Sequence, residues 1–184
     1  MSDDLAAKLR QVLVDGLQPA TVEVVDYDDG WPERFATLSS ALRERLGARA
    51  LRIEHIGSTS VPGLAAKDII DICLTVADPD DEPAYLDDLL GLGWTLVVRE
   101  PRHRVVRYAG PRSNLHVLAD DAAEVTDYLL LREWLRSHPD DRDRYAAYKR
   151  ELASRGEWPD INYYAEAKSP IIREMLAAAK RVGV

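Results

Sequence analysis

The stretch IEHIGSTSVPGLAAKDIIDIC, residues 53–73, joins two apolar runs through a segment of small residues. The runs 51–56 and 69–76 have the length and the apolar content of buried strands, and Gly and Pro lie between them. We therefore expect two neighbouring strands joined by a loop. Asp71 lies inside the second run, where an unpaired carboxylate is costly unless it holds a metal ion or a cationic partner. The stretch thus predicts both a piece of sheet and a candidate site.

Helical and strand patterns continue on both sides of this stretch. Before it and just after it, the apolar spacing predicts helices over residues 5–13, from Pro32 to a stop at Gly47, and over 83–91. Further strands are expected at 21–25, 94–98, 103–108 and 114–118. Five or six strands therefore lie in the first two thirds of the chain.

From Thr126 onward the periodicity is helical. Helices are expected from Thr126, from Pro139 and over residues 160–180. Ser169-Pro170 either kinks the last of these or starts a new helix. Because strands occupy the middle and helices lie before and after them without regular βαβ alternation, the fold class is α+β rather than a doubly wound sheet.

Length, composition and charge restrict the protein class. The 184 residues, 46% hydrophobic and 30% charged, fit one domain over 1–184. The net charge of −8 disfavours general binding to nucleic acid or to an anionic membrane, so an anionic ligand needs a local basic site. No run approaches the length of a membrane span, the single cysteine excludes an internal disulfide, and the N-terminus lacks a signal-peptide pattern. We therefore expect a cytoplasmic protein.

The loop after the first strand has the residue types of a phosphate site. Glycine allows backbone N–H groups to approach a phosphate closely, and hydroxyls can donate to it. Gly57, Ser58, Thr59 and Ser60 are therefore candidates, and Lys67 adds a cation. The alternative is an ordinary Gly/Ser turn, with Asp71 satisfied by backbone amides or by an arginine. Spacing alone leaves both open.

The same residues resemble a known family. The segment 55–67 followed by Ile69-Ile70-Asp71-Ile72 looks like the signature of the GrpB family, a branch of the nucleotidyltransferase fold superfamily. The resemblance covers about residues 20–180 and extends to Tyr27, Trp31-Pro32, Phe35, Leu115-His116-Val117, residues 131–136, Tyr145, Lys149, Tyr164 and Lys168. It implies a small mixed β-sheet flanked by helices with a C-terminal helical segment. It also implies that Gly57-Ser58 faces a nucleotide triphosphate and that an Asp-x-Asp pair holds two Mg²⁺ ions.

The acidic positions implied by the family are only partly present. Asp71 fits the first metal-binding position, but Cys73 stands at the second, and a thiol is a poor ligand for a hard cation. Glu54 and Asp68 are the possible replacements, although Asp68 points to the opposite strand face. His116 stands where the superfamily carries a third acid, and suits general base catalysis or hydrogen bonding as well as it suits metal ligation.

Basic residues recur in two other regions. Residues 99–112 contain five arginines and one acid, which form either an anion site or a solvated edge hairpin. In the C-terminal helices, basic or aromatic residues four apart share a face, and such pairs either present a cation to a ligand or pack. The resemblance assigns a ligand-lining role there to Arg132, Tyr145, Lys149 and Lys168. The acidic runs 78–82 and 140–143 are interpreted as solvated helix caps.

Three functions follow from these residues. The first is a transferase that binds a nucleotide or a related phosphorylated small molecule and catalyses nucleotidyl or other group transfer. The second is a non-catalytic nucleotide- or anion-binding accessory domain. The third is a metal-independent enzyme that uses the same site with His116 or Glu54 as the acid or base. The acceptor, the base preference and the oligomeric state stay open.

Overall fold

The computed structural model describes residues 3–110 and 112–183. Its helices are α1 (Asp3–Val12), α2 (Trp31–Leu46), α3 (Leu86–Gly91), α4 (Ala123–Ser137), α5 (Pro139–Ala153), α6 (Ile161–Ala167) and α7 (Ser169–Val182), with 3₁₀ turns η1 (Gly47–Arg49), η2 (Ser58–Ser60) and η3 (Glu82–Ala84). Its strands are β1 (Ala20–Thr21), β2 (Arg52–Ile56), β3 (Ile70–Val76), β4 (Thr95–Glu100), β5 (His103–Tyr108), β6 (Ser113–Ala119) and β7 (Glu157–Trp158). None of the described helices is long and apolar enough to cross a membrane.

Five strands form one mixed sheet in the order β2-β3-β6-β5-β4. β3 and β6 are parallel, and the other neighbours are antiparallel. The expected adjacency of β2 and β3 is therefore confirmed, as is the α+β class with a small mixed sheet. β1 and β7, which the sequence patterns do not predict as a pair, form a separate two-stranded ribbon.

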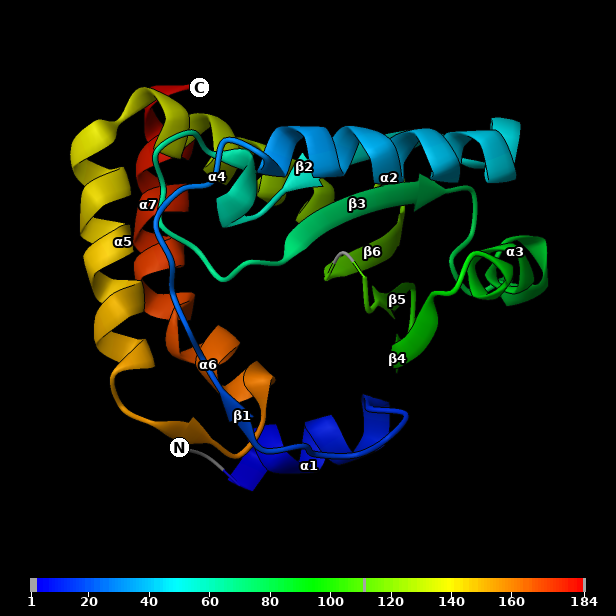
Figure 1. Ribbon diagram of the computed structural model, residues 1–184, viewed down its shortest axis with the longest axis horizontal. Helices are drawn as coiled ribbons and strands as arrows, with labels where there is room; N and C mark the ends of the chain where they lie inside the picture. The colour runs from blue at the N-terminus through cyan, green and yellow to red at the C-terminus, as the bar shows by residue number, and fades with distance from the viewer. Residues whose placement is uncertain (1–2, 111, 184) are drawn as a thin grey trace.

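Strand alternation gives this sheet two unlike faces. Ile70, Ile72, Leu74 and Val76 alternate along β3 and join the core formed with α2 and α3. On the opposite face, Cys73 is covered by Val125 of α4, whereas Asp71 is partly exposed. Figure 1 shows that β3 begins on the side of the sheet that faces α5 and α7, so the first residues of this strand lie near the helical layer.

The C-terminal helices form a second layer against the loop that follows β2. Val61, Leu64 and Ala65 of this loop are buried with residues of α4, α5 and α7. α6 ends at Ala167 and α7 begins at Ser169, so Ser169-Pro170 starts a new helix, in agreement with one of the two expectations. This break brings Lys168 to the junction of the two helices, close to the sheet.

The acidic run 78–82 has a different role from the predicted one. Asp81 precedes η3 but makes no side-chain capping hydrogen bond. Asp80 and Glu82 bind arginines of the β4–β5 hairpin instead: Arg104 contacts both carboxylates, and Arg99 donates to Glu82 at 2.7 Å. Most of the run is exposed, as expected, but the predicted cap is wrong, because sequence spacing does not show which distant strand packs against the turn.

Candidate anion-binding site around Asp71

Asp71 is the residue on which the candidate site is centred. It is the second residue of β3, is partly exposed, and stands opposite Asn114 of β6 in the parallel ladder. The Asn114 side-chain amide donates to its Oδ1 at 2.9 Å. The same asparagine accepts a long hydrogen bond of 3.4 Å from Arg107 Nε. Asp71 is therefore paired through a side chain at the surface of the sheet and is not sealed in an apolar core.

Gly57 is required because it lies directly against this carboxylate. Its φ of +68° falls in the region that favours glycine, and an added Cβ would lie 2.7 Å from Asp71 Oδ2. Both the backbone conformation and the space therefore exclude a side chain at this position.

We predict that Gly57→Ala destabilises the protein by about 2 kcal/mol and displaces Asp71, since strain at a positive φ adds to a steric clash. Urea denaturation measures the first effect. Gly47→Ala is the matched control, because Gly47 also has a positive φ (+58°) but has nothing within 4 Å of an added Cβ. Equal losses in the two variants would show that contact with Asp71 contributes nothing.

The loop after Gly57 binds Lys149 and uses its other hydroxyls internally. Lys149 of α5 is 2% exposed, donates to Ser58 Oγ at 2.8 Å and to the Ala65 carbonyl, and lies 4.6 Å from the centroid of the Tyr145 ring. Thr59 and Ser60 are buried: the Thr59 hydroxyl meets the His55 ring, and Ser60 donates to the Gly57 carbonyl. The structure therefore brings the Ser58 hydroxyl to Lys149, but not the hydroxyls of Thr59 and Ser60.

Two further lysines contact one aromatic ring. Lys67 at the end of the loop and Lys168 at the α6–α7 junction lie 5.7 and 5.0 Å from the centroid of buried Tyr164. Cation–π contact offsets part of the cost of placing ammonium groups here. Lys67, Lys149, Lys168 and Asp71 are close enough to act on one another electrostatically. We call these four residues the Asp71 cluster.

The three lysines share one electrostatic environment. Burial lowers the pKa of Lys67 to about 8, and the positive charge of Lys168 acts in the same direction. The pKa of Lys149 lies well below its usual range, mainly through burial and next through the charge of Lys168. Burial also lowers the pKa of Lys168, and Asp71 partly opposes each of these shifts. The site therefore has more positive charge than one carboxylate balances.

Within the described ranges, the other lysines of the chain are paired with acids, unlike the three in this site. The chain has five lysines. Lys8 and Lys180 are exposed and form salt bridges with Glu100 and Asp127. In the part of the chain that the structure describes, no carboxylate lies within salt-bridge distance of the three lysines around Asp71. Three cations thus gather, partly buried, without the anions that would neutralise them.

His116 lies on the same sheet face as Asp71, two residues along β6 from Asn114. Its Nδ1 is 3.2 Å from Nε2 of His103 on β5, and Nδ1 of His103 is 3.2 Å from a Glu100 carboxylate oxygen. Burial lowers the pKa of His116 to about 4, while the charge of Asp71 raises it. His116 is therefore a neutral imidazole near neutral pH.

The donor set does not fit the magnesium site that the family resemblance implies. Cys73 is 1% exposed, packed with Ile56, Leu118 and Val125, and burial raises the pKa of its thiol to about 12. Among residues 3–110 and 112–183, no group of three His, Cys, Asp or Glu side chains could hold a metal ion. The cations beside Asp71 also disfavour a bound Mg²⁺.

The two possible replacement carboxylates are already engaged. Arg132 of α4 binds Glu54 at 3.0 Å and the His55 carbonyl at 2.8 Å, which ties this helix to β2. Asp68 accepts hydrogen bonds from Trp31 and Arg34, at 2.8 and 2.7 Å. Arg132 therefore serves the structure through Glu54, and neither acid is free beside Asp71.

The sequence predicts that residues 99–112 form either an anion site or a solvated edge hairpin, and their arginines divide between these two roles. The hairpin lies at the sheet edge that β4 forms, and Arg99, Arg102 and Arg104 are paired with acids. Arg107 and Arg112 are exposed and close enough to Lys67 to lower its pKa. Only these two extend the positive charge of the Asp71 cluster.

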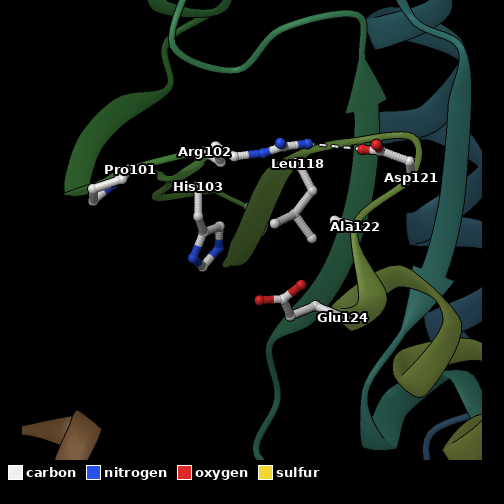
Figure 2. A pocket seen from close by; sticks show the side chains of 7 residues that line it. All are labelled: Pro101, Arg102, His103, Leu118, Asp121, Ala122 and Glu124. Atoms are coloured by element: carbon white, nitrogen blue, oxygen red, sulfur yellow. Dashed lines mark hydrogen bonds and ion pairs between the residues drawn. The ribbon is translucent and has the colours of Figure 1, made fainter.

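Two hollows in the structure lie outside this cluster. One, of about 350 Å³, is bounded by Pro101, Arg102, His103, Leu118, Asp121, Ala122 and Glu124 (Figure 2). The other, of about 430 Å³, is bounded by residues of the loop after β1, the loop after β2 and α5. Neither lining includes Asp71, Lys67, Lys149 or Lys168, so the site is identified by the chemistry of these residues.

Asn114 and His103 are functional candidates that the sequence interpretation missed. Asn114 could have been found from the pattern, because it lies two residues before His116 and so shares its strand face. His103 could not, because its contact with His116 depends on the register of β5 against β6. The sequence spacing pairs Tyr164 with Lys168, whereas its contact with Lys67 depends on tertiary packing.

Comparisons with known proteins agree with the fold. The chain matches the model of a family described as GrpB protein over residues 21–178. The UPF0157 protein BH1888 of Halalkalibacterium halodurans is 44% identical over 177 residues, 94% of this chain and 90% of that protein. The crystal structure of conserved protein GrpB from Enterococcus faecalis has a TM-score of 0.76 at 29% identity and covers 88% of this chain and 100% of its own.

A more distant likeness concerns the fold. The structure of Cid1, a poly(U) polymerase, in complex with its short product ApU has a TM-score of 0.51 at 17% identity, over 72% of this chain and 43% of that one. This identity establishes a shared fold alone. The expected nucleotidyltransferase fold is confirmed, and its chemistry has to be argued from this chain's own residues.

Proposed function

The chain belongs to the GrpB family, and from this premise we propose that it binds a nucleotide or a related phosphorylated small molecule at the Asp71 cluster. The lysine ammonium groups take the phosphates. The Ser58 hydroxyl is a further donor beside Lys149. Asp71, held by Asn114, faces the same ligand and accepts from its hydroxyl or amino groups.

The observation that carries this proposal is the gathering of Lys67, Lys149 and Lys168 with no carboxylate of residues 3–110 and 112–183 in salt-bridge distance. Buried ammonium groups are costly when they lack a partner, and their mutual repulsion adds to the cost. A di- or triphosphate carries several negative charges over a few ångströms and would remove this cost. A single carboxylate ligand would neutralise only part of it.

The nature of the donors also favours a ligand bound without Mg²⁺. In a two-metal transferase, cations neutralise the leaving phosphate and align the attacking group. Here the ammonium groups supply comparable charge, and Cys73 leaves the second acidic position without a ligand. Group transfer from the bound nucleotide stays within the proposal, whereas a two-metal mechanism has the support of the fold alone.

Calorimetry with pyrophosphate and ATP tests this proposal. We expect both to bind, and we expect equimolar Mg²⁺ to weaken binding or leave it unchanged, because the metal competes for the same phosphate oxygens. Binding that requires Mg²⁺ would restore the two-metal reading. No binding of either anion, with or without the metal, would refute the proposed function.

The same site predicts a characteristic pH dependence. Lys67 titrates near pH 8 when folded and near 10.5 when unfolded, so between these values the unfolded chain binds more protons. The stability of the ligand-free protein should therefore rise with pH across this window, while pyrophosphate affinity falls as Lys67 loses its proton. Thermal unfolding with and without pyrophosphate measures both trends. Lys67→Met should weaken both, and unchanged trends in this variant would assign them to other groups.

A further inference from the structure

We propose that His116 is the general base of this site, and that His103 and Glu100 are positioning residues that hold it in the tautomer able to accept a proton. This inference rests on the proposed function, because it supplies the base for an attack on the bound phosphate. It implies that the group that attacks the phosphate is a hydroxyl group or water.

The hydrogen bonds fix the tautomers by elimination. A carboxylate accepts but does not donate, so Nδ1 of His103, 3.2 Å from Glu100 Oε2, carries the hydrogen. In a neutral ring Nε2 of His103 is then an acceptor, and its neighbour at 3.2 Å, Nδ1 of His116, must be the donor. Nε2 of His116 is therefore left with its lone pair.

This lone pair belongs to a ring on the face of the sheet that carries Asp71. In the ladders, Cys73 and Val105 stand beside His116, and Asn114 lies two residues away on the same face. Among the described residues His116 Nε2 has no hydrogen-bond partner, and this atom is not fully buried. It is thus available to a ligand beside Asp71.

The charged surroundings favour proton uptake once a phosphate is present. Burial lowers the pKa of His116 to about 4, Asp71 on β3 opposes this shift, and His103 adds to it. Tyr128 of α4 lies against the His116 ring, with centroids 5.7 Å apart. Burial lowers the pKa of His103, Glu100 and Glu124 oppose this shift, and Arg104 adds to it. A bound anion adds negative charge on the Asp71 side and so stabilises an imidazolium at His116.

The proposed step balances as follows. The O–H bond of the acceptor breaks and its proton moves to Nε2 of His116, while the acceptor oxygen bonds to the phosphorus. The bond from phosphorus to the leaving phosphate breaks, and this phosphate departs as an anion held by the lysines. The Nδ1 hydrogen bond to His103, oriented by Glu100, stabilises the imidazolium. A carboxylate orients the base of a catalytic triad in the same way.

The hollow in Figure 2 gives His103, in the hydrogen-bonded series His116–His103–Glu100, access to solvent. His103 lines the hollow opposite Glu124, and Arg102 and Asp121 are paired beside it, at 2.8 Å. Water in this space can therefore exchange protons with the His103–Glu100 pair between turnovers.

Nitrogen-15 NMR of the histidine rings tests the tautomers directly. We expect the wild-type protein to show His116 protonated at Nδ1 and bare at Nε2, with His103 in the same form. Glu100→Gln should produce a mixture of tautomers in both rings. Lys8→Met is the control, because it removes the partner of Glu100 on the other side while leaving the histidine contacts in place. A wild-type His116 protonated at Nε2 would overturn the proposal.

Turnover supplies the second measurement. With ATP and water, His116→Gln should lower the rate of phosphate release by about 100-fold or more and leave the pyrophosphate affinity within about threefold. His138→Gln is the matched control, since His138 stacks on Trp134 at the end of α4, apart from the Asp71 cluster. Equal rates in the wild type and His116→Gln, including no release by either, would refute the base. If the wild-type protein does not bind pyrophosphate, the proposed function is refuted instead.

Discussion

Replacing Lys149 by Met should reduce the affinity for pyrophosphate or ATP by about 100-fold, equivalent to about 2.8 kcal/mol of binding free energy. A buried, hydrogen-bonded cation at an anion site contributes about 2–5 kcal/mol on truncation, because the ligand charge is left unpaired. Lys149 meets these conditions, since it is 2% exposed and contacts Ser58 at 2.8 Å. Methionine preserves the length of the side chain while removing the charge.

The same substitution should change the free energy of unfolding by less than about 1.5 kcal/mol, or increase it. Loss of the donor to the Ala65 carbonyl destabilises the folded state. Relief of repulsion from Lys67 and Lys168 has the opposite effect. A binding residue that is unfavourable for stability is typical of a functional site, because selection acts on the ligand-bound state.

Calorimetry and urea denaturation separate these two effects. Lys180→Met is the matched control: it removes the same charge from an exposed lysine that pairs with Asp127. The control should leave affinity within about twofold, since exposed charges at a distance are screened. Similar losses in both variants would show that net charge, not the site, governs binding.

The sequence predicts which side chains share a face of a strand. It does not predict which helix packs on that face. Alternation along β3 places Asp71 and Cys73 on one face, and the register confirms this placement. At Asp71 this face is open to solvent, yet at Cys73 it is sealed by Val125 of α4. Strand alternation therefore predicts correctly that residues 71 and 73 share a face, and it gives no sign that a helix covers one of them.

The cations of the site show a similar limit. The pattern marks Lys67 by its place in the loop and Lys149 and Lys168 by their spacing from tyrosines. Their convergence depends on the helix break at Ser169 and on packing of α5 against the loop, which are tertiary features. Arg132 has the same kind of spacing, yet it lies against Glu54. Helical spacing therefore selects candidates, and only the fold shows which of them share a ligand.

Replacing Cys73 by Asp should destabilise the protein by about 3–5 kcal/mol, because it buries a carboxylate with no free partner. Glu54 stands directly opposite Cys73 in the β2–β3 ladder and already engages Arg132, so the new group meets a like charge. Ile56, Leu118 and Val125 surround it with apolar atoms.

Cys73→Asn isolates the charge, since it has nearly the same shape as Asp without the ionisable group, and it should lose less stability. The alternative is that residue 73 still serves as the second position of a metal pair, in which case Asp would add an oxygen ligand. Mg²⁺ and ATP would then stabilise the Asp variant more than the wild type, and a ligand at 100 times its Kd adds about 2.7 kcal/mol. We expect no such gain in thermal unfolding with and without Mg²⁺ and ATP, because α4 closes the space a metal would need. A selective gain for the Asp variant would place a metal beside Asp71 and contradict the assignment of the site's positive charge to its lysines.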